Sequence, residues 1–536
     1  MTGKIKGISG PTVSVDLKGL KLYERVCVGH SMLTGEVVRI EQGRTVIQTY
    51  EDTKGLSINE PVEATGMPLT VRLGPGLLSG MFDGLQRPFS RLIEETGAFI
   101  KTGKDICALD YQRRWRYHPL KDKGEEIKSG EIIGYVEEGR FRHFIMSSNN
   151  GKISSIVDGD FTLNEPLVEL EDGSKIFGCY EWSVRIPRPY KKKFSPSGPL
   201  ITGQRAMDFL FPLARGGTAV LPGGFGTGKT ILEQSIAKFA GVDIVVYVGC
   251  GERGNEMAEL IEDFATLTDP WTGKRLMERT IVVVNTSNMP VAARESSIYT
   301  AVTMAEYYRD MGCHVLLLAD SISRWAEALR EISSSLEEMP GEEGYPTYLA
   351  SRLSNFLERA GVVETLSGKT GSLSMILSVS PPGGDFTEPV TQACLRSAGA
   401  SLMLDTSLAH KRHFPAINWF QSYSLYEKAI SRHFTAHISE KWDELRQRCK
   451  EILQRESALK EVAEIVGMEG LQDSDRFIMY VAERVRMEFL CQNAYTEDAF
   501  SPPEKTVLKI GEIIEFYDNT QKTLKEGMPI DEILKM

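Results

Sequence analysis

The sequence predicts an α/β core with a mostly parallel sheet, accompanied by an N-terminal β-barrel, a β-rich insert and a C-terminal helical domain. Apolar runs of strand length alternate with helical stretches between about residues 195 and 425. Continuous apolar runs of this kind are typical of parallel strands that are covered on both faces. The chain has 536 residues, which is too long for one hydrophobic core. The expected core strands are 218–221, 244–248, 281–284, 315–318 and 373–379.

Changes in pattern along the chain predict five segments. Short alternating runs separated by glycines are typical of a small β-barrel and occupy residues 1–70. An entry segment rich in Gly and Pro follows at 71–110, and strand and turn patterns return in a β-rich bulge insert at 111–188. The α/β segment is 189–425, which opens on a Pro- and Lys-rich linker, and 426–536 is helical.

Composition narrows the functional classes. The net charge of −11 argues against a broad nucleic-acid-coating surface, which needs an excess of Lys and Arg. The basic and aromatic run 113–117 is interpreted as a solvated strand face, because acidic residues surround it. No run approaches the roughly 18 to 20 apolar residues of a membrane span, and the first residues lack a signal-peptide core. The eight cysteines show no C-x-x-C pair, so we expect reduced thiols in a cytoplasmic protein.

The strongest motif lies directly after one expected strand and directly before a helix. It fits the pattern G-x-x-x-x-G-K-[ST], known as the P-loop, and makes 189–425 the predicted nucleotide-binding domain. The glycines allow backbone N–H groups and the helix N-terminus to face a phosphate, Lys229 can reach the β- and γ-phosphates, and the Thr230 hydroxyl can ligate Mg²⁺. A dinucleotide motif does not fit the glycine spacing, and a chance glycine turn would not explain the context. The motif residues are Gly223, Gly224, Phe225, Gly226, Thr227, Gly228, Lys229 and Thr230.

Two further sites follow apolar strands. Asp320 ends the run 314–320, where it can hold the metal ion; the alternative is that it caps the next helix. Glu252 and Arg253 follow the strand 244–248, and loops at the carboxyl ends of parallel strands line the ligand crevice. Glu252 can orient the attacking water and Arg253 can hold Glu252 or meet phosphate charge; the alternative is a surface ion pair.

Several long runs, in this order, make the chain resemble the catalytic A subunit of V-type and archaeal A-type rotary ATPases. Beside the P-loop they read G-C-G-E-R-G-N-E-M at 249–257, N-T-S-N-M-P-V-A-A-R-E at 285–295, A-D-S-x-S-R-W-A-E-A-L-R-E at 319–331 and M-P-G-E-E-G-Y-P at 339–346. The resemblance covers the whole chain and is least specific in the insert and in the C-terminal helices.

The resemblance implies a RecA-like core whose ATP or ADP is bound with Mg²⁺ at interfaces of an alternating A3B3 ring. It implies B-type, central-stalk and peripheral-stalk partners, and a place in the ATPase head that is peripheral to the membrane on the cytoplasmic side. Turnover would be coupled to transport of protons or sodium ions through a separate membrane sector. It assigns Lys229, Glu252 and Arg253 to catalysis, and Thr230 and Asp320 to the metal. Phe414 resembles the adenine-contacting aromatic, with a core aromatic as the alternative, and Tyr495 is a second candidate.

Two positions depart from the family pattern, and one absence is also informative. Gly224 stands where many members have Pro or Ala, and Thr227 stands where eukaryotic relatives have a redox-sensitive Cys. The residues 422–425 stand where the non-catalytic subunit carries an arginine that reaches into the catalytic site. We therefore expect that arginine to come in trans from the B-type partner, as arginine fingers do.

Three alternatives can be distinguished from this function. A non-catalytic nucleotide-binding protein of the ring would be free to lose Glu252, and a nucleic-acid translocase would need a basic or aromatic platform. A type III export ATPase does not usually carry an insert of this length. The insert itself has some likeness to a lipoyl-type sandwich without its acceptor lysine, which favours a structural docking domain. The transported ion and the net direction of turnover depend on other chains.

Overall fold

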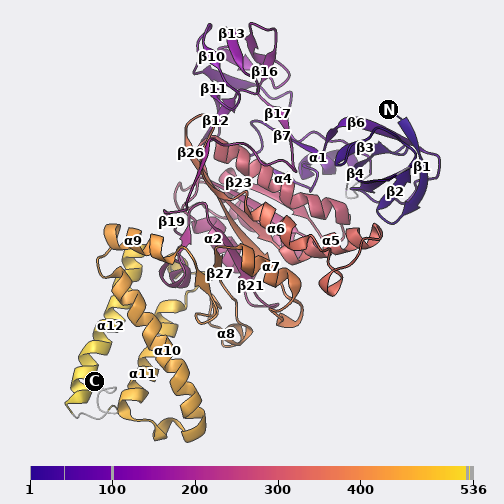
Figure 1. Cartoon of the computed structure of the whole chain (residues 1–536). Helices are drawn as coiled ribbons and strands as arrows, with labels where there is room; N and C mark the ends of the chain where they lie inside the picture. The colour runs from indigo at the N-terminus through magenta and orange to yellow at the C-terminus, as the bar shows by residue number, and fades with distance from the viewer. Residues whose placement is uncertain (1, 42, 98–101, 527–529, 531–536) are drawn as a thin grey trace. The chain divides into compact units, whose positions relative to one another are not determined.

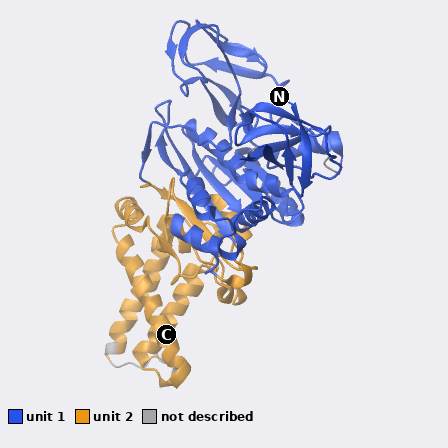
Figure 2. Ribbon diagram, turned by 45° about the vertical axis from the view of Figure 1, so that its right-hand side comes forward, with its two compact units in different colours: residues 1–195, 242–379, 386–397 blue, residues 196–241, 380–385, 398–536 orange. Residues whose placement is uncertain are grey.

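The computed structural model describes residues 2–41, 43–97, 102–526 and 530. The chain forms two compact units, shown in blue and orange in Figure 2. Unit 1 comprises residues 1–195, 242–379 and 386–397, and unit 2 comprises 196–241, 380–385 and 398–536. Each unit therefore combines segments that lie far apart in the sequence.

Unit 1 begins with a closed six-stranded barrel of order β1-β2-β5-β4-β3-β6. Alternation in these strands points one set of side chains inward, and Ile5, Val26, Val37, Ile47 and Val62 are buried at its centre. The barrel that the sequence predicts is therefore present. Its strands are β1 (Thr2–Ser9), β2 (Thr12–Val15), β3 (Glu24–Val28), β4 (Leu33–Glu41), β5 (Arg44–Thr49) and β6 (Pro61–Pro68).

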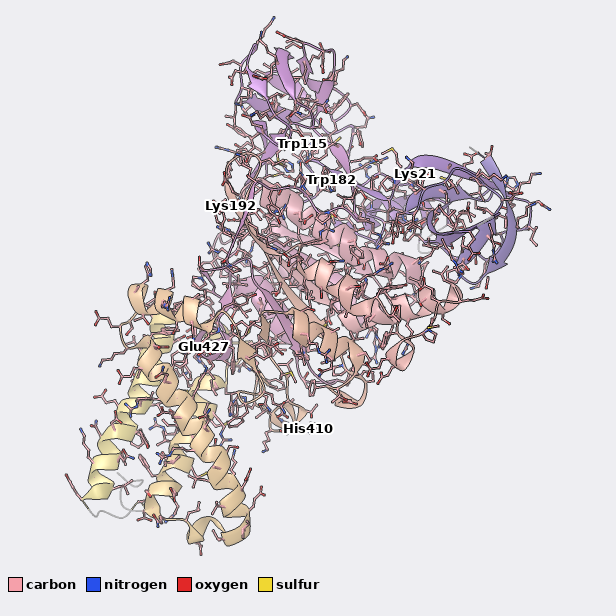
Figure 3. All side chains as sticks on the ribbon, viewed as in Figure 1. Lys21, Trp115, Trp182, Lys192, His410 and Glu427 are labelled. Atoms are coloured by element: carbon pink, nitrogen blue, oxygen red, sulfur yellow. The ribbon has the colours of Figure 1, made fainter. Side chains whose placement is uncertain are left out.

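The β-rich insert consists of two four-stranded antiparallel sheets. Its basic and aromatic run alternates faces: Trp115 and Tyr117 are buried, whereas Arg114 and Arg116 are exposed. The solvated face predicted for this run is therefore formed by its arginines, while its aromatics belong to the insert core; Figure 3 labels Trp115. One sheet is β10 (Glu126–Ile127), β13 (Gly151–Ile156), β15 (Pro166–Leu170) and β16 (Lys175–Phe177), and the other is β12 (Phe141–Met146), β11 (Ile132–Glu138), β9 (Trp115–Pro119) and β14 (Gly159–Phe161).

The rest of unit 1 is a parallel sheet with helices packed on it. The parallel order is β26-β24-β22-β23-β8, and every residue of β22 and β23 is buried, as their continuous apolar runs predict. Helix α4 packs against several of these strands and is buried from Ala292 to Asp310 (Figure 1). The strands are β8 (Met81–Phe82), β22 (Ile244–Cys250), β23 (Thr280–Asn285), β24 (His314–Asp320) and β26 (Thr370–Val379); β25 (Gly361–Glu364) and β18 (Lys192–Phe194) continue the sheet antiparallel. The helices are α1 (Phe89–Thr96), α3 (Gly254–Thr266), α4 (Val291–Asp310), α5 (Ile322–Ser335), α6 (Leu349–Leu357) and α7 (Pro389–Ser397). Strand β7 (Thr70–Leu73) pairs with β17 (Tyr180–Ser183), where the chain returns from the insert.

Unit 2 contains the P-loop and the C-terminal helices. Strand β21 (Thr218–Pro222) pairs in parallel with β27 (Ala400–Ser401), and β28 (Tyr423–Ser424) pairs antiparallel with β27. Phe209 and Phe434 pack against the buried Trp442, and Phe489 packs against Phe209, which ties the helices to the segment before the P-loop. The remaining strands are β19 (Pro199–Leu200) and β20 (Leu213–Ala214), and the helices of five or more residues are η1 (Ala206–Leu210), α2 (Lys229–Phe239), α8 (Thr406–His410), α9 (Glu427–His437), α10 (Trp442–Val466), α11 (Asp473–Arg484), η6 (Val485–Leu490) and α12 (Pro503–Lys525).

These elements confirm the predicted fold class: barrel, β-rich insert, parallel-sheet core and helical C-terminal domain. Among the helices of the described residues, none combines the length and the apolar character that crossing a membrane requires.

Candidate nucleotide site

The P-loop connects β21 to α2 within unit 2. Gly226 and Gly228 have φ values of 75° and 82°, a left-handed conformation that a residue with a Cβ adopts at a cost. The buried Thr227 hydroxyl donates to the Gly224 carbonyl at 2.9 Å, and Lys229 Nζ donates to the carbonyls of Gly223 and Gly224. Lys229 begins α2, so the loop ends at a helix N-terminus, where backbone N–H groups face an anion.

A pocket of about 550 Å³ lies beside the last glycine of this loop. Phe414 and Tyr495, the two predicted adenine-contacting aromatics, both line it. A Cβ on Gly228 would lie 3.2 Å from the Phe414 ring, so the ring lies against the loop backbone. Phe414 is 39% exposed and Tyr495 is 83% exposed, so neither is a core aromatic. The pocket is also lined by Gln204, Ile231, Leu232, Ser235, Arg412, Pro415, Cys491, Gln492, Asn493 and Ala494.

Two residues that no sequence motif predicts hold the segment 491–498, part of which lines this pocket. Gln492 donates its backbone N–H to the Phe414 carbonyl at 2.7 Å, and its amide donates to the carbonyls of Gly203 and Asp498. The buried Arg205 forms an ion pair with Asp498 and donates to the Cys491 carbonyl at 2.7 Å. A charged residue in the mostly apolar run 199–221 is the signal that could have drawn attention to Arg205, because a buried cation needs partners.

Glu252 and Asp320 lie at the carboxyl ends of neighbouring parallel strands in unit 1. Gly249 of β22 is in register with Asp320, the last residue of β24, and the Ser321 N–H donates to the Cys250 carbonyl at 3.2 Å. Asp320 is 4% exposed and Glu252 is partly buried. Burial, reinforced by the negative charge of Asp320, raises the pKa of Glu252 to about 7. Ser321, and not Asp320, occupies the N-cap position of α5.

Arg253 is mostly exposed and stands at the N-cap position of α3. It forms an ion pair with Glu256 at 3.7 Å, one turn into that helix. This ion pair joins Arg253 to its own helix.

Residues 422–425 stand where the non-catalytic B-type subunit is expected to carry an arginine, and they include the strand β28. Tyr423 and Ser424 form that short strand, and the Ser424 hydroxyl donates to the Pro212 carbonyl. Leu425 follows and is 75% exposed. The predicted site residues thus fall into two groups, with the P-loop, Phe414 and Tyr495 in unit 2 and Glu252, Arg253 and Asp320 in unit 1.

Comparisons with known proteins assign a family model to each of the main parts of the chain. The family model for the ATP synthase alpha/beta nucleotide-binding domain matches residues 203–424, and the alpha/beta beta-barrel domain matches 5–66. The barrel-sandwich domain of the alpha/beta subunits matches 106–185, and the C-terminal domain of V and A type ATP synthases matches 431–534. The fold and the P-loop thus define a nucleotide-binding subunit of the ATP synthase alpha/beta class.

Whole-chain relatives narrow the class further. The A subunit of the A-type ATP synthase of Methanopyrus kandleri is 51% identical over all of this chain and 92% of that protein. The corresponding subunits of Methanosarcina barkeri and Halobacterium salinarum are each 49% identical, covering 100% and 99% of this chain and 93% and 92% of the relatives. The chain belongs to the family of A-type ATP synthase A subunits, the catalytic subunits that couple ATP synthesis or hydrolysis to ion transport.

A solved structure shares the fold at low identity. The assembled ATPase EscN of the enteropathogenic E. coli type III secretion system matches with a TM-score of 0.70 and 22% identity, covering 96% of this chain and 100% of that one. This likeness concerns the fold alone, and the predicted family is confirmed by the closer relatives.

Proposed function

We propose that this chain turns over Mg-ATP at a site in which the P-loop holds the phosphates and Glu252 orients the attacking water. The observation that carries the proposal is the Glu252–Asp320 pair at the ends of β22 and β24. Two partly or wholly buried carboxylates at neighbouring strand ends repel each other, so they are costly unless they meet a cation or a reacting group. A protein that only binds nucleotide has no need of the second carboxylate.

The phosphate and metal ligands are proposed to be Lys229, Thr230 and Asp320. Hydroxyl and carboxylate oxygens are the ligands that Mg²⁺ prefers, so Thr230 and Asp320 suit it chemically. When bound, Mg²⁺ would neutralise charge on the β- and γ-phosphate oxygens. Lys229 stays close to the loop through its bonds to the Gly223 and Gly224 carbonyls, from which it can turn to the phosphates.

The adenine is proposed to lie in the pocket between Phe414 and Tyr495. An aromatic ring against Gly228 offers a stacking surface directly beside the helix that receives the phosphates. Mostly apolar walls with a few polar groups are typical of ligand pockets of this size. Arg205 and Gln492 are proposed as positioning residues that keep the Tyr495 loop in place.

The assembly is proposed to be a ring of alternating A and B subunits with central and peripheral stalks. The exposed Leu425, where an arginine would stand in the B-type protein, supports an arginine supplied in trans. The chain would meet the membrane only through an ion-translocating sector, as part of the head on the cytoplasmic side. The relatives are named as subunits of an A-type ATP synthase, which supports a place for this chain in a multisubunit complex.

The proposed role of Glu252 is tested by the substitution Glu252→Gln in the assembled complex. Loss of a general base should lower kcat by roughly 10² to 10⁴ and leave the affinity for Mg-ADP nearly unchanged. Glu259→Gln is the matched control, since Glu259 is an exposed carboxylate of α3, the helix that follows the same loop. Unchanged turnover in the Glu252 variant would indicate a nucleotide-binding protein without catalysis of its own.

A further inference from the structure

A second pocket lies at the base of the β-rich insert, within unit 1. Its volume is about 260 Å³, which is below the usual range for nucleotide-sized ligands. The insert contributes Ser129, Gly130 and residues 146–148, and the returning strand β17 contributes Tyr180 and Trp182. Figure 3 labels Trp182.

Arg188 is the buried cation of this pocket. It is 5% exposed, its Nε donates to Asp310 at 2.6 Å, and its Nη2 donates to the Tyr180 hydroxyl at 2.7 Å. Its Nη1 has no hydrogen-bond partner among the residues that the structure describes. A buried guanidinium nitrogen without an acceptor is costly, so this nitrogen marks a place for one.

The ion pairs around Arg188 leave positive charge in excess. Asp310 pairs with both Arg188 and Arg309, and Glu306 pairs with both Arg309 and Arg359. In this buried group three guanidinium groups therefore face two carboxylates. A further buried carboxylate, Glu138, is bonded to His143 Nδ1 and to the Gly76 N–H.

The other acidic residue that lines the pocket is also paired. Glu181 accepts from Arg72 at 3.3 Å and from the Thr70 hydroxyl at 2.8 Å. The Trp182 ring lies 4.9 Å from the Arg188 guanidinium carbon and covers one face of the cation. Of the Arg188 guanidinium nitrogens, Nη1 is thus the one without an acceptor among the described residues.

We propose that Arg188 is the centre of a binding site for a small oxyanion, phosphate or carboxylate, at the base of the insert. The Arg188 guanidinium would donate to the anion through Nη1, and the exposed Ser129 and Ser148 hydroxyls lie at the rim. The apolar Met146 and Leu366 side chains complete the walls. The anion would balance the excess charge and join the insert to the C-terminal end of α4, which holds Asp310.

Backbone geometry keeps the pocket narrow. Gly130 has a φ of 81°, and a Cβ there would lie 2.5 Å from Leu366. Leu366 lies in the connection between β25 and β26 and lines the pocket. Only glycine at position 130 allows the backbone to approach Leu366 this closely. The site is therefore shaped by the meeting of insert and sheet, independently of the P-loop.

The first experiment locates the anion. Crystals of the full chain saturated with Mg-ADP, so that the P-loop is occupied, are soaked in selenate, and anomalous data are collected at the selenium edge. We expect a selenium peak with an oxygen within hydrogen-bond distance of Arg188 Nη1. Water at Nη1 without a selenium peak would overturn the proposal.

The second experiment measures affinity in solution by calorimetry, again with Mg-ADP bound. Arg188→Gln should abolish selenate binding, but it also leaves Asp310 short of a partner and can unfold the region. Ser148→Glu avoids this problem because Ser148 is exposed at the rim. We expect Ser148→Glu to weaken binding roughly 10-fold and Ser148→Lys to strengthen it several-fold.

The matched control is Ser155→Glu, which makes the same change at an exposed residue of β13 that does not line the pocket. Equal affinities in the Ser148→Glu and Ser155→Glu variants would contradict the site. Titrations with inorganic phosphate and with acetate then identify which oxyanion the pocket binds. Saturable binding of either anion supports the proposal, and failure of both anions to bind overturns it.

Discussion

Burial sets the protonation of individual carboxyl groups in this protein. Glu252 and Asp208 both have pKa values raised to about 7, mainly by burial. Glu252 has the charge of Asp320 beside it, whereas Asp208 is surrounded by donors: the N–H and hydroxyl of Thr202 and the N–H of Gly203. These bonds lower the pKa of Asp208 but do not offset its complete burial.

The raised pKa of Asp208 predicts a pH-dependent stability. The folded state favours the protonated carboxyl, so its contribution is full below pH 3.8 and is lost as the pH rises through about 7. Asp208→Asn cannot titrate, so wild type should lose ~2–3 kcal/mol relative to the variant between about pH 5 and pH 8. The measurement is the difference in melting temperature between the two proteins across that range.

Asp158→Asn, at an exposed carboxylate of the insert, is the control and should show no such trend. If the melting temperatures of wild type and Asp208→Asn change equally with pH, the raised pKa of Asp208 is contradicted.

The pocket aromatics predict a loss of nucleotide affinity on truncation. Phe414→Ala should weaken Mg-ADP binding by roughly 5- to 150-fold, because stacking on an aromatic ring contributes about 1–3 kcal/mol per base. Calorimetry on the isolated chain measures it. Phe420→Ala removes another exposed aromatic that does not line the pocket, and it should bind as wild type does. Equal effects of the two substitutions would remove Phe414 from the site.

At the scale of elements, the backbone conformation of the P-loop determines which of its glycines can be replaced by Ala. Gly224 has no positive φ, so Ala is allowed there, although a Cβ would lie 3.1 Å from the Thr406 methyl group. Gly226 has open space around it but a φ of 75°. The two glycines therefore differ in the reason for their presence.

Replacing Gly224 and Gly226 by Ala, one at a time, is expected to change the affinity for Mg-ADP in opposite directions. Gly224→Ala should strengthen it by about 2- to 5-fold, because a stiffer loop loses roughly 0.5–1 kcal/mol less on ordering. Gly226→Ala should weaken it by at least about 5-fold, since a left-handed non-glycine residue costs roughly 1–2 kcal/mol. Titration calorimetry compares the two, and a shift in the same direction for both would contradict the argument.

Local patterns predicted the elements that carry chemistry, because each depends on adjacent residues. The P-loop lies between a strand and a helix, and Asp320 ends a strand, as the runs 218–230 and 314–320 indicate. Arg205 and Gln492 were not predicted, because their role comes from hydrogen bonds between segments almost 300 residues apart. The same holds for the alternation in β9, where Trp115 faces a core that the run 113–117 does not reveal.

At the scale of the whole molecule, the proposed site, which lacks an arginine near Leu425, predicts that activity depends on a partner subunit. The isolated chain should hydrolyse ATP poorly, and mixing with its B-type partner should raise the rate by roughly 10³ or more, the contribution of an arginine supplied in trans. Steady-state ATPase assays of the chain with and without the partner measure this. Substituting the partner's arginine is the control and should abolish the stimulation, whereas full activity of the chain alone would contradict it.

The order of domains along the chain was predictable because each domain has its own periodicity, from the alternating barrel to the helical C-terminus. The division of the core between two units was not, because it depends on which strands and helices pack together after the chain has folded.

That division has a consequence for synthesis on the ribosome. The strand β21 and the P-loop emerge early, but β27, the strand with which β21 pairs in unit 2, lies beyond residues 242–397. At about 5 to 20 residues per second, roughly 150 residues take on the order of 10 to 30 seconds to appear. During this interval β21, the strand before the P-loop, lacks its partner β27. A chaperone or bound nucleotide would protect the nascent chain most at this stage of synthesis.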